Sequence, residues 1–175
     1  ASQIILQKGH YILCLKDNHP TFHKKLKELF NSPSLLKSMK ESGVEIDLAK
    51  TEEKSHGREE IRHCVVVENI DWYDESHEWE GLRSVVMIER HRTENEKTSV
   101  EHHYYISSLA ADAQTILAAV RSHWGIENSL HWVLDVSWNE DQSRIRMGNA
   151  AQNVSLLRKI SINMLNESPK KDSLK

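Results

Sequence analysis

The chain has 175 residues, enough for one domain or for one domain with an insertion, and 38% of them are hydrophobic and 28% charged, as in soluble globular proteins. The formal net charge is −3, whereas a protein that binds nucleic acid with its whole surface is strongly basic. Any DNA contact should therefore be confined to local basic groups. No apolar run is long enough to cross a bilayer, and none resembles a secretory signal, so no membrane partner is expected.

The first part of the chain alternates helix and strand patterns. Residues 2–8 resemble the last turns of a helix that ends at Gly9, and residues 10–16 (HYILCLK) predict a buried strand. Pro20 suits a first helical position, and the following helix over 21–30 should turn four side chains inward. These are Phe22, Leu26, Leu29 and Phe30. A second short helical segment should end near Gly43.

The middle of the chain reads as β structure. Residues 58–70, 83–92 and 98–107 are rich in β-branched and aromatic side chains, and the last two runs are joined by a polar loop of hairpin length. We expect a three-stranded antiparallel sheet that extends the strand over 10–16.

The last third is helical in pattern. Residues 111–120 are alanine-rich, a helix should surround Glu127, and residues 150–166 form an amphipathic pattern. The inner face of the last helix should hold Val154, Leu157, Ile160, Met164 and Leu165. The polar tail over 168–175 is expected to be disordered.

Two cysteines, Cys14 and Cys64, lie in the apolar strand-like runs. We predict reduced core residues in a cytosolic protein, and a disulfide between them is the less favoured alternative.

The most informative stretch surrounds Glu127. A helix places residues four apart on one face, so Glu127 should lie between His123 and His131, on a face that also holds Trp124 and Asp135. The neighbouring apolar stripe should point at a core and consists of Ile126, Leu130 and Val133. A carboxylate held by a packed helix suits a divalent metal.

The eleven histidines raise the alternative of a zinc protein. The protease motif His-Glu-x-x-His and any Cys-x-x-Cys pair are absent, so we favour exposed or hydrogen-bonded histidines, including His102 and His103.

Two arginine groups could contact phosphates. Arg58 and Arg62 share one face of an extended run, where phosphate binding and cross-strand ion pairing are equally supported. Arg144 and Arg146 follow Asn139-Glu-Asp141, and acids beside arginines more often form ion-paired scaffolding.

Several of these motifs together resemble the H-repeat-associated group of bacterial insertion-sequence transposases, which are DDE (Asp-Asp-Glu) transposases. The resemblance rests on residues 123–128 (HWGIEN), 130–132 (LHW), 134–136 (LDV), 139–141 (NED) and Arg144. Residues 9–20 (GHYILCLKDNHP) and 56–59 (HGRE) with Arg62 also resemble motifs of that group.

The resemblance implies a ribonuclease-H-like catalytic fold and two Mg²⁺ ions, which drive DNA cleavage and strand transfer. Glu127 would be the third metal-binding and catalytic carboxylate. The candidate DNA contacts are Arg58, Arg62, His123, Arg144, Arg146 and Lys159. The implied supporting residues are Trp124, Asn128, His131, Asp135 and Asp141. Related transposases carry Arg at the position of His123 and Lys about two turns past the Glu, where this chain has Leu134 or Asp135.

The implied architecture is mixed α+β or α/β, a partial ribonuclease-H-like fold with an inserted antiparallel sheet and C-terminal helices. Residues 1–56 would form part of the core, 57–108 the β-rich insertion, 109–166 the completing helices and 167–175 the tail. The first three strands of the family's sheet would be missing, which leaves a hydrophobic edge that favours self-association.

Both metal-binding aspartates of the family would precede Ala1, because Asp17, Asp47 and Asp71 fall in the wrong elements. We therefore expect the C-terminal part of a transposase, inactive alone, that derives from an excised piece, a truncated gene or a relic. The alternative is a non-catalytic DNA-binding or assembly module.

Overall fold

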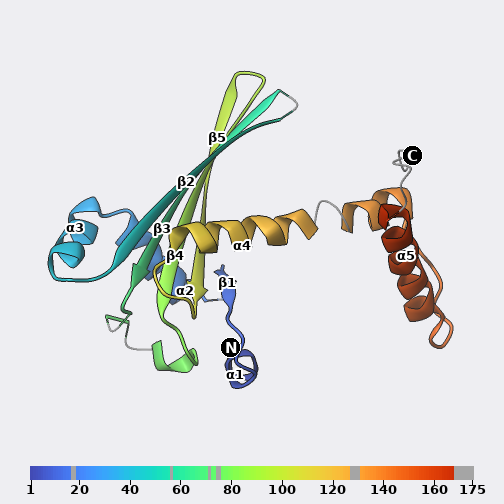
Figure 1. Ribbon diagram of the computed structural model, residues 1–175, viewed down its shortest axis with the longest axis horizontal. Helices are drawn as coiled ribbons and strands as arrows, with labels where there is room; N and C mark the ends of the chain where they lie inside the picture. The colour runs from blue at the N-terminus through green and yellow to red at the C-terminus, as the bar shows by residue number, and fades with distance from the viewer. Residues whose placement is uncertain (17–18, 56, 71, 74–75, 127–130, 168–175) are drawn as a thin grey trace. The chain divides into compact units, whose positions relative to one another are not determined.

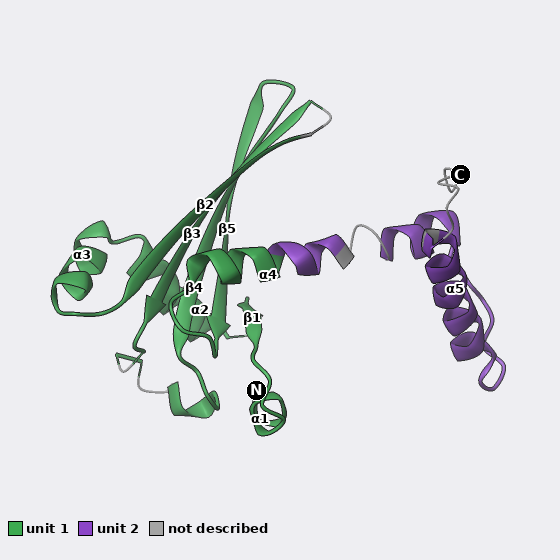
Figure 2. Cartoon of the chain, viewed as in Figure 1, with its two compact units in different colours: residues 1–120 green, residues 121–175 purple. Residues whose placement is uncertain are grey.

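The computed structural model describes residues 1–16, 19–55, 57–70, 72–73, 76–126 and 131–167. The chain divides into two compact units, Ala1–Val120 and Arg121–Lys175, shown in separate colours in Figure 2. In the described ranges, no helix combines the length and the apolar character that a membrane crossing needs.

The first unit is built on a five-stranded antiparallel sheet in the order β1-β5-β4-β3-β2 (Figure 1). Its strands are β1 (Ile12–Leu15), β2 (Ile46–Ser55), β3 (Arg58–Glu68), β4 (Ser84–Glu94) and β5 (Lys97–Ser107). The three predicted central strands and their extension by β1 are confirmed. The sequence pattern did not identify β2, whose second half (KTEEKS) is charged and polar.

The helices of the first unit follow the predicted order. They are α1 (Ser2–Leu6), α2 (Pro20–Phe30), α3 (Pro33–Glu41) and most of α4 (Ala113–Ile126), with the short 3₁₀ turn η1 (Ser76–Glu78). Pro20 is at the start of α2, as predicted, since its fixed φ suits a first helical turn and it has no N–H to leave unpaired.

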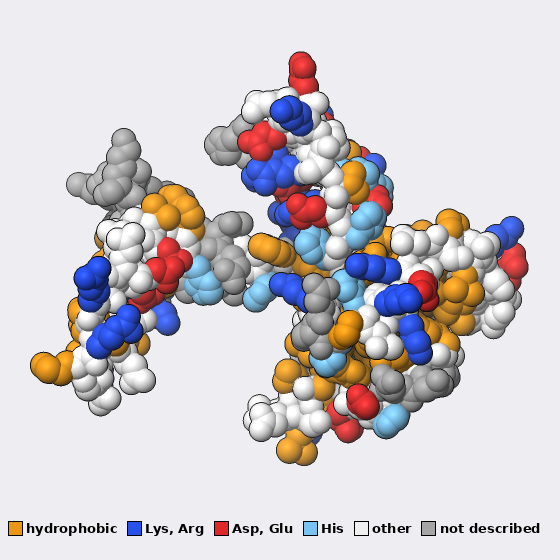
Figure 3. Space-filling model, turned by 180° about the vertical axis from the view of Figure 1, so that it is seen from behind, with side chains coloured by type: hydrophobic (Ala, Val, Ile, Leu, Met, Phe, Trp, Pro, Cys, Tyr) orange, Lys and Arg blue, Asp and Glu red, His pale blue; other side chains and the backbone are white. Residues whose placement is uncertain are grey.

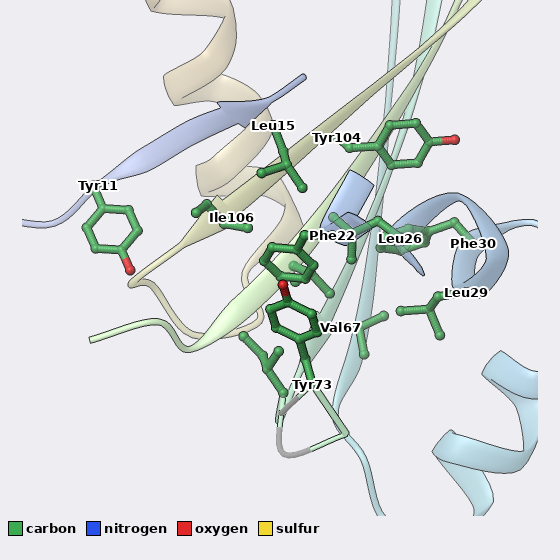
Figure 4. Close-up of a cluster of buried hydrophobic side chains, with 12 residues drawn as sticks. Tyr11, Leu15, Phe22, Leu26, Leu29, Phe30, Val67, Tyr73, Tyr104 and Ile106 are labelled. Atoms are coloured by element: carbon green, nitrogen blue, oxygen red, sulfur yellow. The ribbon is translucent and has the colours of Figure 1, made fainter. Parts of the chain in front are cut away.

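The core on one face of the sheet is formed mainly by α2. Phe22, Leu26, Leu29 and Phe30 are all buried, as the helical spacing predicted. Figure 4 shows them with Leu15, Val67, Tyr104 and Ile106 from the strands and with Tyr73. Phe22 stacks on Tyr73 with ring centroids 3.9 Å apart, which ties the connection between β3 and β4 to this face.

The opposite face of the sheet is covered by α4 (Figure 1). Ala113, Ile116 and Leu117 are almost fully buried against a second cluster of strand side chains. The strand residues of that cluster are Cys64, Val66, Val86, Ile88 and Tyr105. The alternation along each strand thus supplies two separate cores, one on each side of the sheet.

Two local predictions are wrong. The first helix ends at Leu6, and Lys8, not Gly9, has the left-handed backbone, with a φ of 59°. Gly9 instead allows a close approach, because a Cβ there would lie 3.1 Å from Ile4 Cγ2. Cys14 is exposed on the edge strand, whereas Cys64 is buried as predicted, and both thiols are free.

The second unit contains the remainder of α4, the π-helical turn η3 (Val133–Ser137) and α5 (Ala150–Glu167). The predicted inner face of α5 is largely exposed, which corrects that expectation. Leu157, Ile160, Met164 and Leu165 are exposed, while Ile162 is the buried residue of this helix among those described. The tail over 168–175 lies outside the described residues.

Candidate functional site

The helix that leads to the Glu127 motif is fixed to the sheet by carboxylates at its N-terminal end. Asp47 on β2 accepts a hydrogen bond from the Ala113 N–H at 2.8 Å, and Glu68 on β3 accepts one from the Ala111 N–H at 2.8 Å. Asp112 accepts the Thr115 N–H at 2.9 Å in the manner of an N-cap. Negative charge at a helix N-terminus is favourable, so the strands orient α4 directly.

The pKa values of Glu68 and Asp112 are lowered by these contacts. The Ala111 N–H, assisted by Arg83, lowers the pKa of Glu68, and the Thr115 side chain and backbone lower the pKa of Asp112. Both groups are therefore charged at neutral pH.

The C-terminal half of α4 carries the start of the motif. His123 is exposed and Trp124 is half-exposed, and the described helix ends at Ile126. Glu127, Asn128 and Leu130 lie outside the described residues, as does the side chain of Ile126. The predicted face that joins His123, Glu127 and His131 is therefore not described, and its role stays a prediction.

The motif continues in η3. Leu134 is buried and Val133 is half-buried, whereas Trp132 and Asp135 are exposed. His131 and Asp141 are also exposed. Of the predicted apolar stripe only Val133 is described, and it is half-buried; Leu134 is buried, whereas the apolar Trp132 and Val136 are exposed together with the polar side chains.

The C-terminal arginines differ in their surroundings. Arg144 and Arg146 are exposed in the segment between η3 and α5, and Lys159 is exposed on α5. Arg158 lies 3.6 Å from Glu140, so one of the two acidic residues of the 139–141 motif has a basic partner on α5.

The other arginine group belongs to the first unit and is engaged by acids. Arg58 pairs with Glu60 at 3.1 Å, and Arg62 contacts both Glu60 and Glu53. Glu60 is buried, so the paired arginines compensate a charge that would otherwise be costly. Of these ion pairs, Arg62–Glu53 crosses from β3 to β2, as one of the two alternatives predicted, whereas both pairs with Glu60 lie within β3; phosphate binding by these arginines stays a prediction.

One group of potential ligands was missed by the sequence analysis. His63 on β3 and Glu89 and His91 on β4 present their ligand atoms within 4.8 Å of one another. The sequence shows only that Glu89 and His91, two residues apart, share one face of a strand. The pairing of β3 with β4 is needed to see that His63 lies beside them.

Comparison with known proteins identifies the family. Residues 3–164 match the family described as "Transposase DDE domain". The chain belongs to the DDE transposase family. The resemblance inferred from the Glu127 motif is thereby confirmed, and no solved structure matches the chain.

Named relatives of this DDE transposase chain come from Escherichia coli. A putative transposase YncI of strain O157:H7 is 40% identical over 95% of this chain and 42% of its own length. A putative protein YbfL and an H repeat-associated putative transposase YhhI of strain K12 are 38% and 37% identical, each over 94% of this chain and 43% of their own length. The chain thus spans less than half the length of these relatives.

Proposed function

We propose that this chain is the C-terminal part of the catalytic domain of a DDE transposase, which cleaves and transfers DNA strands in the bacterial cytoplasm. In this proposal Glu127 is the third carboxylate of a Mg²⁺ site whose two aspartates belong to preceding sequence. The observation that carries the proposal is the family match over residues 3–164, which includes Glu127 and its motif.

The arrangement of the first unit supports this assignment. Glu127 directly follows α4 in the sequence, and α4 is anchored to β2 and β3 by Asp47 and Glu68. We assign this mixed α+β unit to part of a ribonuclease-H-like fold in which β1 neighbours the missing strands. The predicted boundaries of the β-rich insertion, at 56/57 and 108/109, stay predictions. The first of them separates β2 from β3, although these two strands pair along the full length of β2.

The metal requirement of the family is not met by this chain alone. Mg²⁺ favours near-octahedral oxygen coordination, and a two-metal site needs several carboxylates. Among the described residues, the group of three potential ligands contains two histidines, a set that does not suit Mg²⁺. We therefore expect no Mg²⁺-dependent catalysis by this chain.

A plasmid-nicking assay with Mg²⁺ tests this expectation. The chain alone should leave supercoiled DNA intact. Nicking that disappears in Glu127→Gln would contradict the proposal, because it would show a complete site within this sequence.

A longer polypeptide encoded together with the upstream sequence tests the role of Glu127. It should contain two aspartates at strand ends and cleave DNA with Mg²⁺, and Glu127→Gln should slow cleavage by a factor on the order of 10² or more, since a metal ligand contributes several kcal/mol. Glu167→Gln, at the exposed end of α5, is the matched control and should cleave normally.

The second candidate function is a non-catalytic DNA-binding or assembly module. It is favoured by the exposed Arg144, Arg146 and Lys159 of the second unit. DNA affinity should then fall steeply with salt, and the double variant Arg144→Gln/Arg146→Gln should reduce the slope of log K against log salt by about 2 if both side chains contact phosphates. Arg92→Gln, whose arginine pairs with Glu94 at 2.7 Å, is the control; absence of binding at low salt would exclude this function.

A further inference from the structure

Four polar side chains gather on one face of the sheet in the first unit. The strand register aligns His63 on β3 with Glu89 on β4 and His102 on β5, and His91 lies two residues from Glu89 on the same face. Side chains two apart on a strand point the same way, so the four form one compact group. Histidines are visible among charged side chains over the strands in Figure 3.

The group is already organised around Glu89. His91 Nε2 lies 2.6 Å from Glu89 Oε1, and His102 Nε2 lies 2.9 Å from Glu89 Oε2. The rings of His63 and His91 meet edge to face with centroids 5.9 Å apart. His63, Glu89 and His91 are half-buried, which limits their freedom but leaves the group accessible from solvent.

Charge favours a cation at this position. Glu89 supplies a carboxylate, and each of its two oxygens lies within hydrogen-bond distance of a histidine ring nitrogen. The nearest strand on the other side of His63 contributes Lys50, which is aligned with His63. Its ammonium lies 2.5 Å from Glu52, so its charge is compensated locally.

We propose that His63, Glu89 and His91 bind one Zn²⁺ or a similar transition-metal ion that links β3 to β4. Two imidazoles and one carboxylate are ligands that zinc accepts, with a fourth position for water. Ligand atoms on a zinc tetrahedron lie about 3.3 Å apart, given bond lengths of about 2.0–2.1 Å. The ligand atoms now lie within 4.8 Å of one another, which approaches this spacing.

His102 has a distinct role in this site. Because its Nε2 contacts the second oxygen of Glu89, the carboxylate can bind the metal through Oε1 while His102 holds Oε2 in place. Partners of this kind orient a ligand and typically alter metal affinity by roughly 10- to 100-fold when they are removed.

The site is independent of the proposed DNA chemistry. It lies wholly in the first unit, uses nitrogen ligands that Mg²⁺ disfavours, and does not involve Glu127. A metal here would join neighbouring strands and stabilise the folded sheet, because it binds the native arrangement and not the unfolded chain.

Zinc titration of the whole chain, stripped of metal with a chelator, tests the proposal. Calorimetry with Zn²⁺ alone should show a site of one ion per chain, and Zn²⁺ should raise the melting temperature. His63→Gln and His91→Gln should each weaken this site at least 10-fold and abolish the thermal shift, and His102→Gln should weaken it by roughly 10- to 100-fold. Co²⁺ in place of Zn²⁺ should give the visible absorption of tetrahedral coordination.

His103→Gln is the matched control. His103 is adjacent to His102 on β5 but points to the opposite face, where it lies 3.3 Å from Glu101. This variant should bind Zn²⁺ like the parent chain. Circular dichroism of each variant confirms that the sheet is folded. The proposal is overturned if the folded parent chain takes up no Zn²⁺, or if His63→Gln and His91→Gln bind it as tightly as His103→Gln does.

Discussion

Two carboxylates of the sheet, Asp47 and Glu68, connect the strands to the beginning of α4. Each accepts a backbone N–H at 2.8 Å, and Glu68 also accepts a hydrogen bond from Arg83 at 2.6 Å. Hydrogen bonds to charged groups are stronger than neutral ones, so these few contacts determine where α4 begins on the sheet. This matters for function because the Glu127 motif begins in the C-terminal half of α4.

At the same scale, Glu68→Gln should lower the free energy of unfolding by about 1.5 kcal/mol at pH 7, since a charge-assisted hydrogen bond contributes roughly 1.5–3 kcal/mol. The folded-state pKa of Glu68 is lowered, chiefly by the Ala111 N–H. Its contribution is therefore fully present above the unfolded pKa of about 4.3 and is lost as the pH falls through the lower folded pKa. Urea unfolding at several pH values should show parent and variant converging in acid.

The matched control for this substitution is Glu28→Gln. Glu28 is an exposed residue of α2 that lies 3.9 Å from Lys24, and such surface pairs contribute about 0–1 kcal/mol. A Glu28→Gln loss equal to that of Glu68→Gln would argue against a specific anchor for α4.

At the scale of the elements, the β4–β5 hairpin shows a mismatch between residue type and turn geometry. Asn95 and Glu96 have φ values of 49° and 63°, the left-handed pair that a two-residue hairpin of type I′ needs. Asparagine tolerates this conformation, but glutamate is strained in it. The predicted five-residue loop is therefore shortened to a tight turn, because β4 and β5 continue pairing up to Glu94 and Lys97.

Glu96→Gly should accordingly stabilise the protein by about 0.5–1 kcal/mol, as relief of backbone strain outweighs the added freedom of the unfolded chain. Thermal unfolding measures the effect. Lys97→Gly, one residue later and within β5, should instead destabilise the sheet, since glycine weakens a strand. Destabilisation by both substitutions would show that the turn does not favour glycine.

At the scale of the whole molecule, β1 is an edge strand with β5 on one side. Among the described residues no strand pairs with its other side, and Cys14 on this strand is exposed. An edge of this kind offers backbone donors and acceptors to another chain. We therefore retain the expectation that the isolated chain associates with itself.

Sedimentation velocity in reducing buffer should show a mass that rises with concentration, and Cys14→Lys should shift the population toward monomer because a charge on an edge strand opposes pairing. Gln3→Lys adds the same charge at an exposed site of α1 and should leave the mass distribution unchanged. A purely monomeric parent chain would contradict this expectation.

The sequence by itself determined the features that depend on near neighbours. The spacing of Phe22, Leu26 and Leu29 defines the buried face of α2, and residues 123–128 carry the family resemblance, because helical periodicity and short motifs are local. The prediction was wrong for the inner face of α5. Amphipathic spacing shows which side of a helix is apolar, but burial of that side also needs another part of the structure to pack against it.

Only the tertiary structure decided the features that depend on register. It paired the charged half of β2 with β3, placed Arg62 of β3 beside Glu53 of β2, and aligned His63 with Glu89 and His102. Residues far apart in sequence meet across strands, and a shift of one residue would move each side chain to the opposite face. No local pattern encodes that choice, so the proposed zinc site became recognisable only once the strands were paired.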